Sequence, residues 1–120
     1  MRVFIADDSE ILRERLVENL SQLPNVNVVG EAKDVTTAKQ LIDEIEFDIA
    51  LYDIKMPNGS GIELIEHTKM KNPSAKIIMM TNYSIDSYKN KCLEEGADYF
   101  FDKSNLDEAL LLIEKLSVDE

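Results

Sequence analysis

The hydrophobic and polar residues of the chain follow two alternating patterns. Short runs of mainly apolar residues, bounded by polar or turn-forming residues, are typical of buried β-strands. Such runs predict five strands, at residues 2–6, 26–32, 49–52, 76–80 and 99–101. The longer segments between and after them repeat apolar residues every three or four positions, which is the period of an amphipathic helix. The chain is therefore predicted to form a strand followed by a helix, five times over.

Start and stop signals support the five predicted helices. Ser9, Asp34 and Ser84 are candidate N-caps, because their side-chain oxygens can accept hydrogen bonds from a first helical turn. Residues 104–107 resemble a capping box, and Pro73 ends the helix predicted at 62–71. The apolar stripes of the other four helices are formed by Leu12, Leu16, Leu20 and Leu23; Val35, Ala38, Leu41, Ile42 and Ile45; Ile85, Tyr88 and Cys92; and Leu106, Leu110, Ile113 and Leu116.

Strands that alternate with helices of this length predict βαβ units with right-handed crossovers. The expected fold class is therefore α/β, a doubly wound parallel sheet with helices on both faces. No linker, repeat or low-complexity segment interrupts the pattern. We expect residues 1–120 to form a single domain.

Composition and charge narrow the function classes. The chain has 120 residues, 44% of them hydrophobic, and a formal net charge of −11. Such a surface repels phosphate backbones, so direct binding to nucleic acid is not expected. The single cysteine, Cys92, excludes an internal disulfide and a cysteine-based metal site. The first strand reaches Asp7 too early for a signal peptide, and no apolar run suits a membrane span, so we expect a cytoplasmic protein.

Polar residues follow the apolar runs at four of the five strand ends. They are Asp7-Asp8, Asp53, Thr81 and Lys103. In a parallel sheet all carboxyl ends lie on one edge, where ligands of such folds bind. Three carboxylates there repel one another unless a cation joins them, and hard oxygen ligands suit Mg²⁺. The chain thus predicts a site that combines a divalent cation, a hydroxyl and an ammonium.

The chemistry of this set points to phosphoryl transfer. A metal ion and Lys103 can both neutralise charge on a phosphoryl group, and Thr81 can donate a hydrogen bond to it. Aspartate carboxylates can act as nucleophiles toward phosphorus. Because Asp53 ends the central strand, it is the predicted nucleophile, with Asp7 and Asp8 as metal ligands.

The motif set resembles that of the receiver domains of response regulators in two-component signalling. The resemblance runs in order along the whole chain and rests on Asp7-Asp8, Asp53, Met56-Pro57 with Gly61, Thr81 and Lys103. It implies a flavodoxin-like sheet with strand order 2-1-3-4-5. It also implies a phosphorylation-dependent switch that catalyses only its own phosphorylation and slow dephosphorylation, rather than an enzyme with a separate substrate.

The resemblance implies specific roles at the site. Asp53 would accept the phosphoryl group from a phosphohistidine of a sensor histidine kinase or a phosphotransfer protein. Asp8, Asp53 and the backbone carbonyl of Lys55 would bind Mg²⁺ or Mn²⁺ directly, with Asp7 acting largely through water. Thr81 and Lys103 would bind the phosphoryl oxygens.

The resemblance also implies how a signal leaves the site. Thr81 would move toward the phosphoryl group, Phe100 would rotate into the vacated space, and the surface of helix 4, strand 5 and helix 5 would change. Lys55, Asn82 and Tyr83 occupy positions that modulate access of water to the phosphoryl group. Because Asn82 stands where receivers usually carry a small residue, we predict slow hydrolysis. At Lys103-Ser104, where receivers often have a cis peptide before proline, this chain has no proline.

Other functions fit the sequence less well. A phosphatase similar to haloacid dehalogenases requires a D-x-D pattern at the first strand, where this chain has Asp7-Asp8-Ser9. A flavodoxin-like electron carrier requires a Ser/Thr/Gly-rich loop there, and a receiver that only binds partners would have a degraded pocket. Within the receiver family, a stand-alone protein and a receiver separated from its output domain both remain open, as do a monomer and a weak dimer. Output would pass through a protein target or a C-terminal domain outside this chain.

Overall fold

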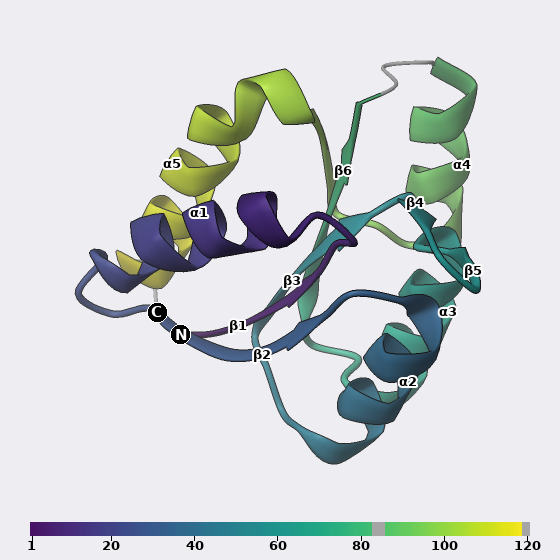
Figure 1. Cartoon of the computed structure of the whole chain (residues 1–120), viewed down its shortest axis with the longest axis horizontal. Helices are drawn as coiled ribbons and strands as arrows, with labels where there is room; N and C mark the ends of the chain where they lie inside the picture. The colour runs from purple at the N-terminus through teal and green to yellow at the C-terminus, as the bar shows by residue number, and fades with distance from the viewer. Residues whose placement is uncertain (83–85, 119–120) are drawn as a thin grey trace.

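A five-stranded parallel sheet forms the centre of the molecule (Figure 1). The computed structural model describes residues 1–82 and 86–118. The strands lie in the order β2-β1-β3-β6-β7, and each neighbouring pair is parallel. Their bounds are β1 Arg2–Ala6, β2 Asn27–Ala32, β3 Ile49–Asp53, β6 Lys76–Thr81 and β7 Tyr99–Asp102. Counted along the main sheet, this is the predicted order 2-1-3-4-5, which is confirmed.

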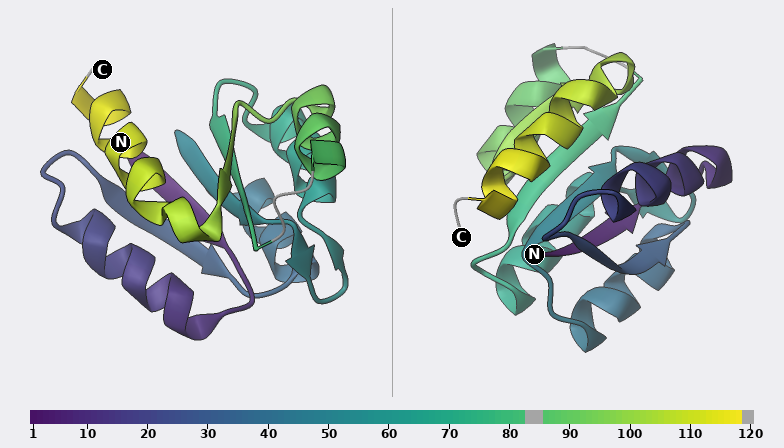
Figure 2. Two further views of the ribbon diagram at one scale, coloured as in Figure 1. Left: turned by 90° about the horizontal axis from the view of Figure 1, so that it is seen from above. Right: turned by 90° about the vertical axis from the view of Figure 1, so that its left-hand side faces the viewer.

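Helices cover both faces of the sheet, as Figures 1 and 2 show. Their bounds are α1 Glu10–Ser21, α2 Val35–Glu44, α3 Ile62–Lys71, α4 Asp86–Glu95 and α5 Leu106–Val118. Helices α1 and α5 lie on one face, and α2, α3 and α4 lie on the other. None of the helices in the described ranges is long and apolar enough to cross a bilayer.

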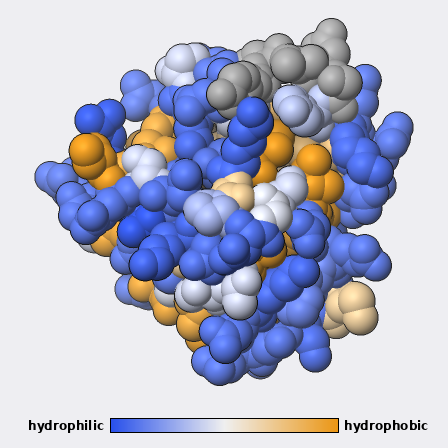
Figure 3. Space-filling view, turned by 45° about the vertical axis from the view of Figure 1, so that its right-hand side comes forward, coloured by the Kyte–Doolittle hydropathy of each residue, from blue (hydrophilic) through white to orange (hydrophobic). Residues whose placement is uncertain are grey.

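The core consists of two apolar layers, one on each side of the sheet. In β1, Val3 and Ile5 face the layer under α1 and α5, whereas Phe4 and Ala6 face the layer under α2 and α3. Strands buried on both faces give continuous apolar runs rather than alternation, which explains the sequence pattern. Outside the core, the face in Figure 3 is largely hydrophilic, with apolar side chains in small patches.

Two of the predicted helix caps are present. Ser9 Oγ accepts a hydrogen bond from Leu12 N at 3.2 Å, and Asp34 Oδ1 accepts one from Thr37 N at 2.7 Å. The predicted cap at Ser84 lies outside the described residues. These bonds begin α1 and α2 directly after the sheet, so the loops at its carboxyl edge are short.

The start of α5 differs from the predicted capping box at residues 104–107. A 3₁₀ turn, η1 (Lys103–Asn105), precedes the helix, and Asp102 Oδ1 accepts the hydrogen bond from Ser104 N at 2.8 Å. Aspartate readily accepts from the backbone amide two residues ahead, so Asp102 takes the role expected of Ser104. The peptide bonds of the described residues are all trans, including the one between Lys103 and Ser104.

The loop after β3 contains a small hairpin that periodicity did not predict. Its strands are β4 (Lys55–Met56) and β5 (Gly59–Ser60), paired antiparallel. Asn58 has a φ of 67° and Gly59 a φ of 143°, a region that favours glycine at the second position. The hairpin closes onto the end of β3, because a Cβ at Gly61 would lie 1.8 Å from the Asp53 carbonyl oxygen. Only glycine fits there without moving the backbone.

Candidate functional site

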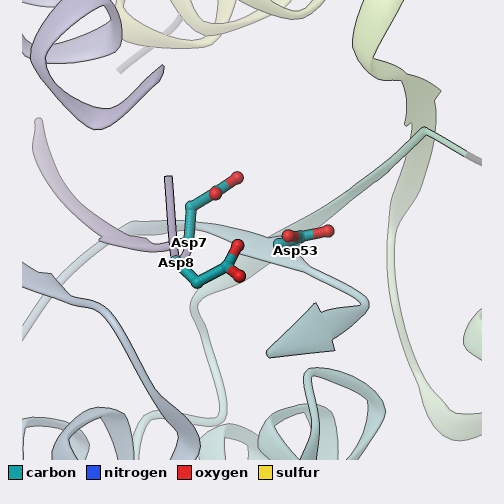
Figure 4. A group of neighbouring side chains, drawn as sticks. All are labelled: Asp7, Asp8 and Asp53. Atoms are coloured by element: carbon teal, nitrogen blue, oxygen red, sulfur yellow. The ribbon is translucent and has the colours of Figure 1, made fainter. Parts of the chain in front are cut away.

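Three carboxylates meet at the carboxyl edge of the sheet (Figure 4). Asp7 and Asp8 directly follow β1, and Asp53 is the last residue of the neighbouring strand β3. One carboxylate oxygen from each residue lies within 4.8 Å of the others. Asp7 and Asp53 are buried, and Asp8 is exposed. The structure thus brings together the acidic residues that the strand ends indicated.

Lys103, which directly follows the edge strand β7, also belongs to the acidic cluster. Its Nζ lies 2.8 Å from Asp7 Oδ2 and donates a hydrogen bond to Asp53 Oδ2 at 3.1 Å. The Lys103 side chain is only 11% exposed, so it is part of the site and not a surface charge. Among the described residues, Asp7 Oδ2 receives no well-oriented hydrogen bond and has this ion pair in its place.

Burial and charge set the protonation of the cluster. Burial and the charge of Asp7 raise the pKa of Asp53 to about 6, against the opposing effect of Lys103. Burial lowers the pKa of Lys103, but the carboxylates of Asp7 and Asp53 outweigh burial and hold that pKa above its ordinary value. Lys103 is therefore charged at neutral pH. One ammonium leaves three acidic groups incompletely neutralised.

The cluster fits a hard divalent cation. Mg²⁺ prefers carboxylate and carbonyl oxygens, keeps several waters, and is typically held by one or two protein carboxylates. Asp8 offers an exposed carboxylate and Asp53 a buried one, within 4.8 Å of each other. The buried Asp7 Oδ2, which lacks a well-oriented donor, can accept a hydrogen bond from a metal-bound water. The donor set and this oxygen together suit a hydrated magnesium ion.

The loop after Asp53 is held from several directions. Gly61 N and Ser60 Oγ both donate hydrogen bonds to the Ile54 carbonyl, at 2.7 and 3.1 Å. Lys55, which pairs with Ser60 in the hairpin, has an exposed side chain. Pro57 also accepts a hydrogen bond from Val35 N at 3.2 Å, which ties the loop to the start of α2. These bonds fix the backbone on both sides of Lys55, whose carbonyl is the expected metal ligand.

Thr81 and Phe100 lie on the same face of the sheet. Met80 pairs with Asp53 across β3 and β6, so Thr81 extends one residue beyond Asp53 at the carboxyl edge. Phe100 pairs with Met79, and both belong to the apolar layer under α2, α3 and α4. Because side chains alternate along a strand, Thr81 points to the same face as Met79. Thr81 is buried, and Phe100 is half-buried.

The residues expected to modulate access to the site are partly described. Asn82 follows Thr81 and is exposed. Lys55 is exposed on the neighbouring loop. Tyr83 lies outside the described residues.

Sequence reasoning missed two contacts that hold Asp7. Ser9, predicted only as a helix cap, donates its backbone N–H to Asp7 Oδ1 at 2.8 Å. Arg13 Nη1 donates a hydrogen bond to the Asp7 carbonyl at 2.6 Å. Side chains on a helix lean toward its N-terminus, so a basic residue one turn into α1 was the signal for the second contact.

Comparison with known proteins finds relatives along nearly the whole chain. Residues 3–114 match the family model of the response regulator receiver domain. The chain is 33% identical over 97 residues to the DNA-binding transcriptional activator DevR/DosR of Mycobacterium tuberculosis, covering 81% of this chain and 45% of that protein. It is 38% identical over 103 residues to a cyclic di-GMP phosphodiesterase of Thermotoga maritima, covering 86% of this chain and 27% of that protein.

Solved structures give the same result. The isolated REC domain of RcsB from Salmonella enterica serovar Typhimurium, determined in the presence of the phosphomimetic BeF₃⁻, is similar with a TM-score of 0.83 and 30% identity. The match covers 96% of this chain and 88% of that one. The chain spans less than half the length of the two relatives named above, which differ from each other in activity. The similarity therefore concerns the receiver and not what those proteins do with it.

Proposed function

Because the chain belongs to the family of response regulator receiver domains, we propose that Asp53 is its phosphoacceptor and that a phosphoryl group there switches its surface. One observation carries the proposal. Asp53 is 6% exposed at the end of the central strand, with Lys103 Nζ 3.1 Å from its Oδ2 and Asp7 and Asp8 within 4.8 Å. Such a carboxylate has a nucleophilic oxygen, a cation partner and candidate metal ligands in one place.

The transfer step uses the Asp53 carboxylate as nucleophile. With a pKa of about 6, Asp53 is mostly ionised at neutral pH. A carboxylate oxygen attacks phosphorus, an acyl–phosphate bond forms, and the phosphorus–nitrogen bond of the phosphohistidine breaks with its electron pair returning to the imidazole. The Lys103 ammonium, already bonded to Asp53, can neutralise the charge that develops on the phosphoryl oxygens.

A bound Mg²⁺ would supply further neutralisation of the phosphoryl group. Asp8, Asp53 and the Lys55 carbonyl are the residues proposed to hold it, and Asp7 would act through water. The chain itself would bind and orient the reactants: it holds the phosphoacceptor, the hydrogen-bond donors to the phosphoryl group and the metal ligands in fixed positions.

Thr81 and Phe100 are proposed to carry the signal away from Asp53. A phosphoryl group adds negative charge and acceptor oxygens. The Thr81 hydroxyl, one residue beyond Asp53 in the register of β3 and β6, would donate to one of them. Movement of Thr81 would make room on the face where the half-buried Phe100 lies, and the α4–β7–α5 surface would change with it.

Kinases and outputs are proposed by class. Receiver domains interact with histidine kinases or phosphotransfer proteins and with output domains. This chain would take its phosphoryl group from such a kinase and act on a protein target or an output domain. The two relatives named above have different activities alongside a region similar to this chain, so the similarity does not indicate which output this chain would control.

Uptake of a phosphoryl group from a small-molecule donor tests the proposal. The chain is incubated with acetyl phosphate and Mg²⁺, and its intact mass is measured. We expect the mass to rise by one phosphoryl group in the wild type, but not in Asp53→Asn and not in EDTA. Asp48→Asn, at the opposite end of β3, is the matched control and should be labelled like the wild type. Equal labelling of Asp53→Asn would overturn the proposal.

A further inference from the structure

We propose that Arg13 is a positioning residue for the divalent cation. Through the Asp7 carbonyl it would fix the direction in which Asp8 presents its carboxylate to the metal. The inference rests on the proposed function for the presence of the cation.

Arg13 connects α1, the acidic cluster and the edge strand β2. Its Nη1 donates a hydrogen bond to the Asp7 carbonyl at 2.6 Å, and its Nε lies 3.5 Å from Glu31 Oε1 on β2. The Arg13 side chain is 15% exposed, much less than a solvated surface arginine. A planar guanidinium with donors on several sides can make both contacts at once, whereas a single ammonium cannot do so in the same way.

Three of the four polar atoms of Asp7 make hydrogen bonds. Its N–H donates to the Ala32 carbonyl at 3.0 Å, and its Oδ1 accepts from Ser9 N at 2.8 Å. Oδ2 faces Lys103, and the carbonyl accepts from Arg13. The contact from Arg13 is the one that acts on the bond leading to Asp8.

The geometry of the peptide bond carries the effect to Asp8. The Asp7 carbonyl and the Asp8 amide share one rigid plane. A hydrogen bond that fixes this oxygen therefore fixes the plane from which the Asp8 side chain leaves the backbone. Asp8 is exposed, so packing does not restrain its carboxylate as it restrains Asp7. Groups that orient a metal ligand in this way commonly change metal affinity by about 10–100-fold when removed.

Electrostatics alone predicts the opposite sign. Arg13 is a cation beside a cation site, so removing its charge would strengthen Mg²⁺ binding if charge were all that mattered. The ion pair with Glu31 offsets part of that repulsion and stabilises the guanidinium in its position. A positioning role therefore predicts that a neutral side chain at residue 13 weakens binding even though the repulsion is gone.

The test is the Mg²⁺ dissociation constant, measured from amide chemical shifts during a titration of the unphosphorylated chain. We expect Arg13→Met to raise Kd by about tenfold. Arg15→Met, which removes the same charge from an exposed position on the same helix, should leave Kd unchanged. Arg13→Lys should recover part of the affinity, because its ammonium can still donate to the Asp7 carbonyl.

The outcomes separate this inference from the proposed function. If the wild type binds no Mg²⁺, the proposed metal chemistry fails, and the role of Arg13 fails with it. If the wild type binds Mg²⁺ and Arg13→Met binds equally or more tightly, only the role of Arg13 is overturned. A loss in Arg13→Lys as large as that in Arg13→Met would also overturn it, since general damage to α1 would then explain both.

Discussion

Two aspartates at opposite ends of the same strand have opposite environments. Asp48 directly precedes β3 and accepts hydrogen bonds from Arg2 N at 2.7 Å, Arg2 Nε at 3.4 Å and Arg2 Nη2 at 3.3 Å. Burial acts to raise the pKa of Asp48, but the hydrogen bonds and charge of Arg2 outweigh it and hold that pKa below its usual value. Asp53 ends the strand, and its pKa is raised to about 6 by burial and by Asp7.

This difference in pKa distinguishes a structural carboxylate, Asp48, from the proposed phosphoacceptor, Asp53. At Asp48, the donors satisfy the charge, so ionisation stabilises the fold. At Asp53, burial and a like charge oppose ionisation, and one ammonium does not fully compensate. A carboxylate held in this way costs stability and is ready to accept a cation or an electrophile. The carboxyl edge of the sheet is therefore the end at which we propose that the chemistry takes place, whereas the Asp48 contacts at the amino edge are structural.

The largest expected effect comes from a substitution at Gly61, which packs against the end of β3. Gly61→Ala would place a Cβ 1.8 Å from the Asp53 carbonyl oxygen, so the hairpin or the end of β3 must move. We expect the free energy of unfolding to fall by about 3 kcal/mol, as for an overpacked buried position. Urea unfolding followed by circular dichroism measures this.

Gly96→Ala is the control for a glycine away from the site. Its φ of 112° makes alanine unfavourable there as well, but the site is not touched. Both variants should lose stability, while only Gly61→Ala should also lose phosphoryl uptake in the folded fraction. Normal uptake by folded Gly61→Ala would contradict the role of the hairpin.

The second prediction sharpens the contrast between the two carboxylates through pH. The pKa of Asp53 is higher in the folded state than in the unfolded chain, so protonation of Asp53 favours folding. This contribution to the free energy of unfolding is fully present below about pH 4 and is lost as pH rises to about 6. In EDTA at pH 7.5, Asp53→Asn should therefore be more stable than the wild type by about 1–2 kcal/mol, after allowance for partial solvent screening. The gain should disappear near pH 4. Urea unfolding across this pH range gives both values.

Asp48→Asn should show the opposite behaviour. The lowered pKa of Asp48 means that its charge stabilises the fold above its unfolded pKa and that this is lost as pH falls. The variant should be less stable than the wild type at neutral pH, by less than about 1 kcal/mol, because both side chains of the pair are partly exposed to solvent. If both variants changed stability in the same direction, the two ends would not differ as described.

Sequence periodicity predicted the sheet because buried parallel strands are continuous apolar runs, such as Lys-Ile-Ile-Met-Met at 76–80. It placed Asp7, Asp8, Asp53 and Lys103 correctly at one edge, since every strand of a parallel sheet ends there. It missed the β4–β5 hairpin, because two-residue strands have no detectable period. The predicted capping box at residues 104–107 was wrong. Both Asp102 and Ser104 can accept a hydrogen bond from a first helical turn, and the backbone geometry decides between them. The contacts of Arg13 were missed because its place one turn into α1 indicates only the direction of its side chain, and the structure is needed to show that it meets the Asp7 carbonyl.

The third prediction concerns the cation. Because Mg²⁺ binds the folded state, it should stabilise the wild type by about 1.4 kcal/mol at ten times its Kd. Asp8→Asn should lose most of this gain, whereas Asp48→Asn should keep it. Thermal unfolding with and without Mg²⁺ measures the difference. An equal gain in all three proteins would show that the ion acts on the general acidic charge and not on the site.

The smallest expected effect concerns how long the phosphoryl group stays on Asp53. Replacing Asn82 and Tyr83 together by alanine should speed hydrolysis several-fold, because less bulk would then shield the phosphoryl group from water. Lys55 is kept unchanged. The decay of the phosphorylated mass after donor removal gives the rate, with Asn90→Ala on α4 as control. An unchanged rate in the double variant would show that these side chains do not shield the phosphoryl group from water.

The position of the modified carboxylate tests most directly whether Asp53 is the phosphoacceptor. The chain is phosphorylated with acetyl phosphate and Mg²⁺, the acyl phosphate is reduced with borohydride, and the modified residue is located by peptide mass spectrometry. We predict a single modified position, Asp53, with none at Asp7, Asp8 or Asp48. Modification at Asp7 or Asp8 in place of Asp53, or none at any aspartate of the wild type, would contradict it.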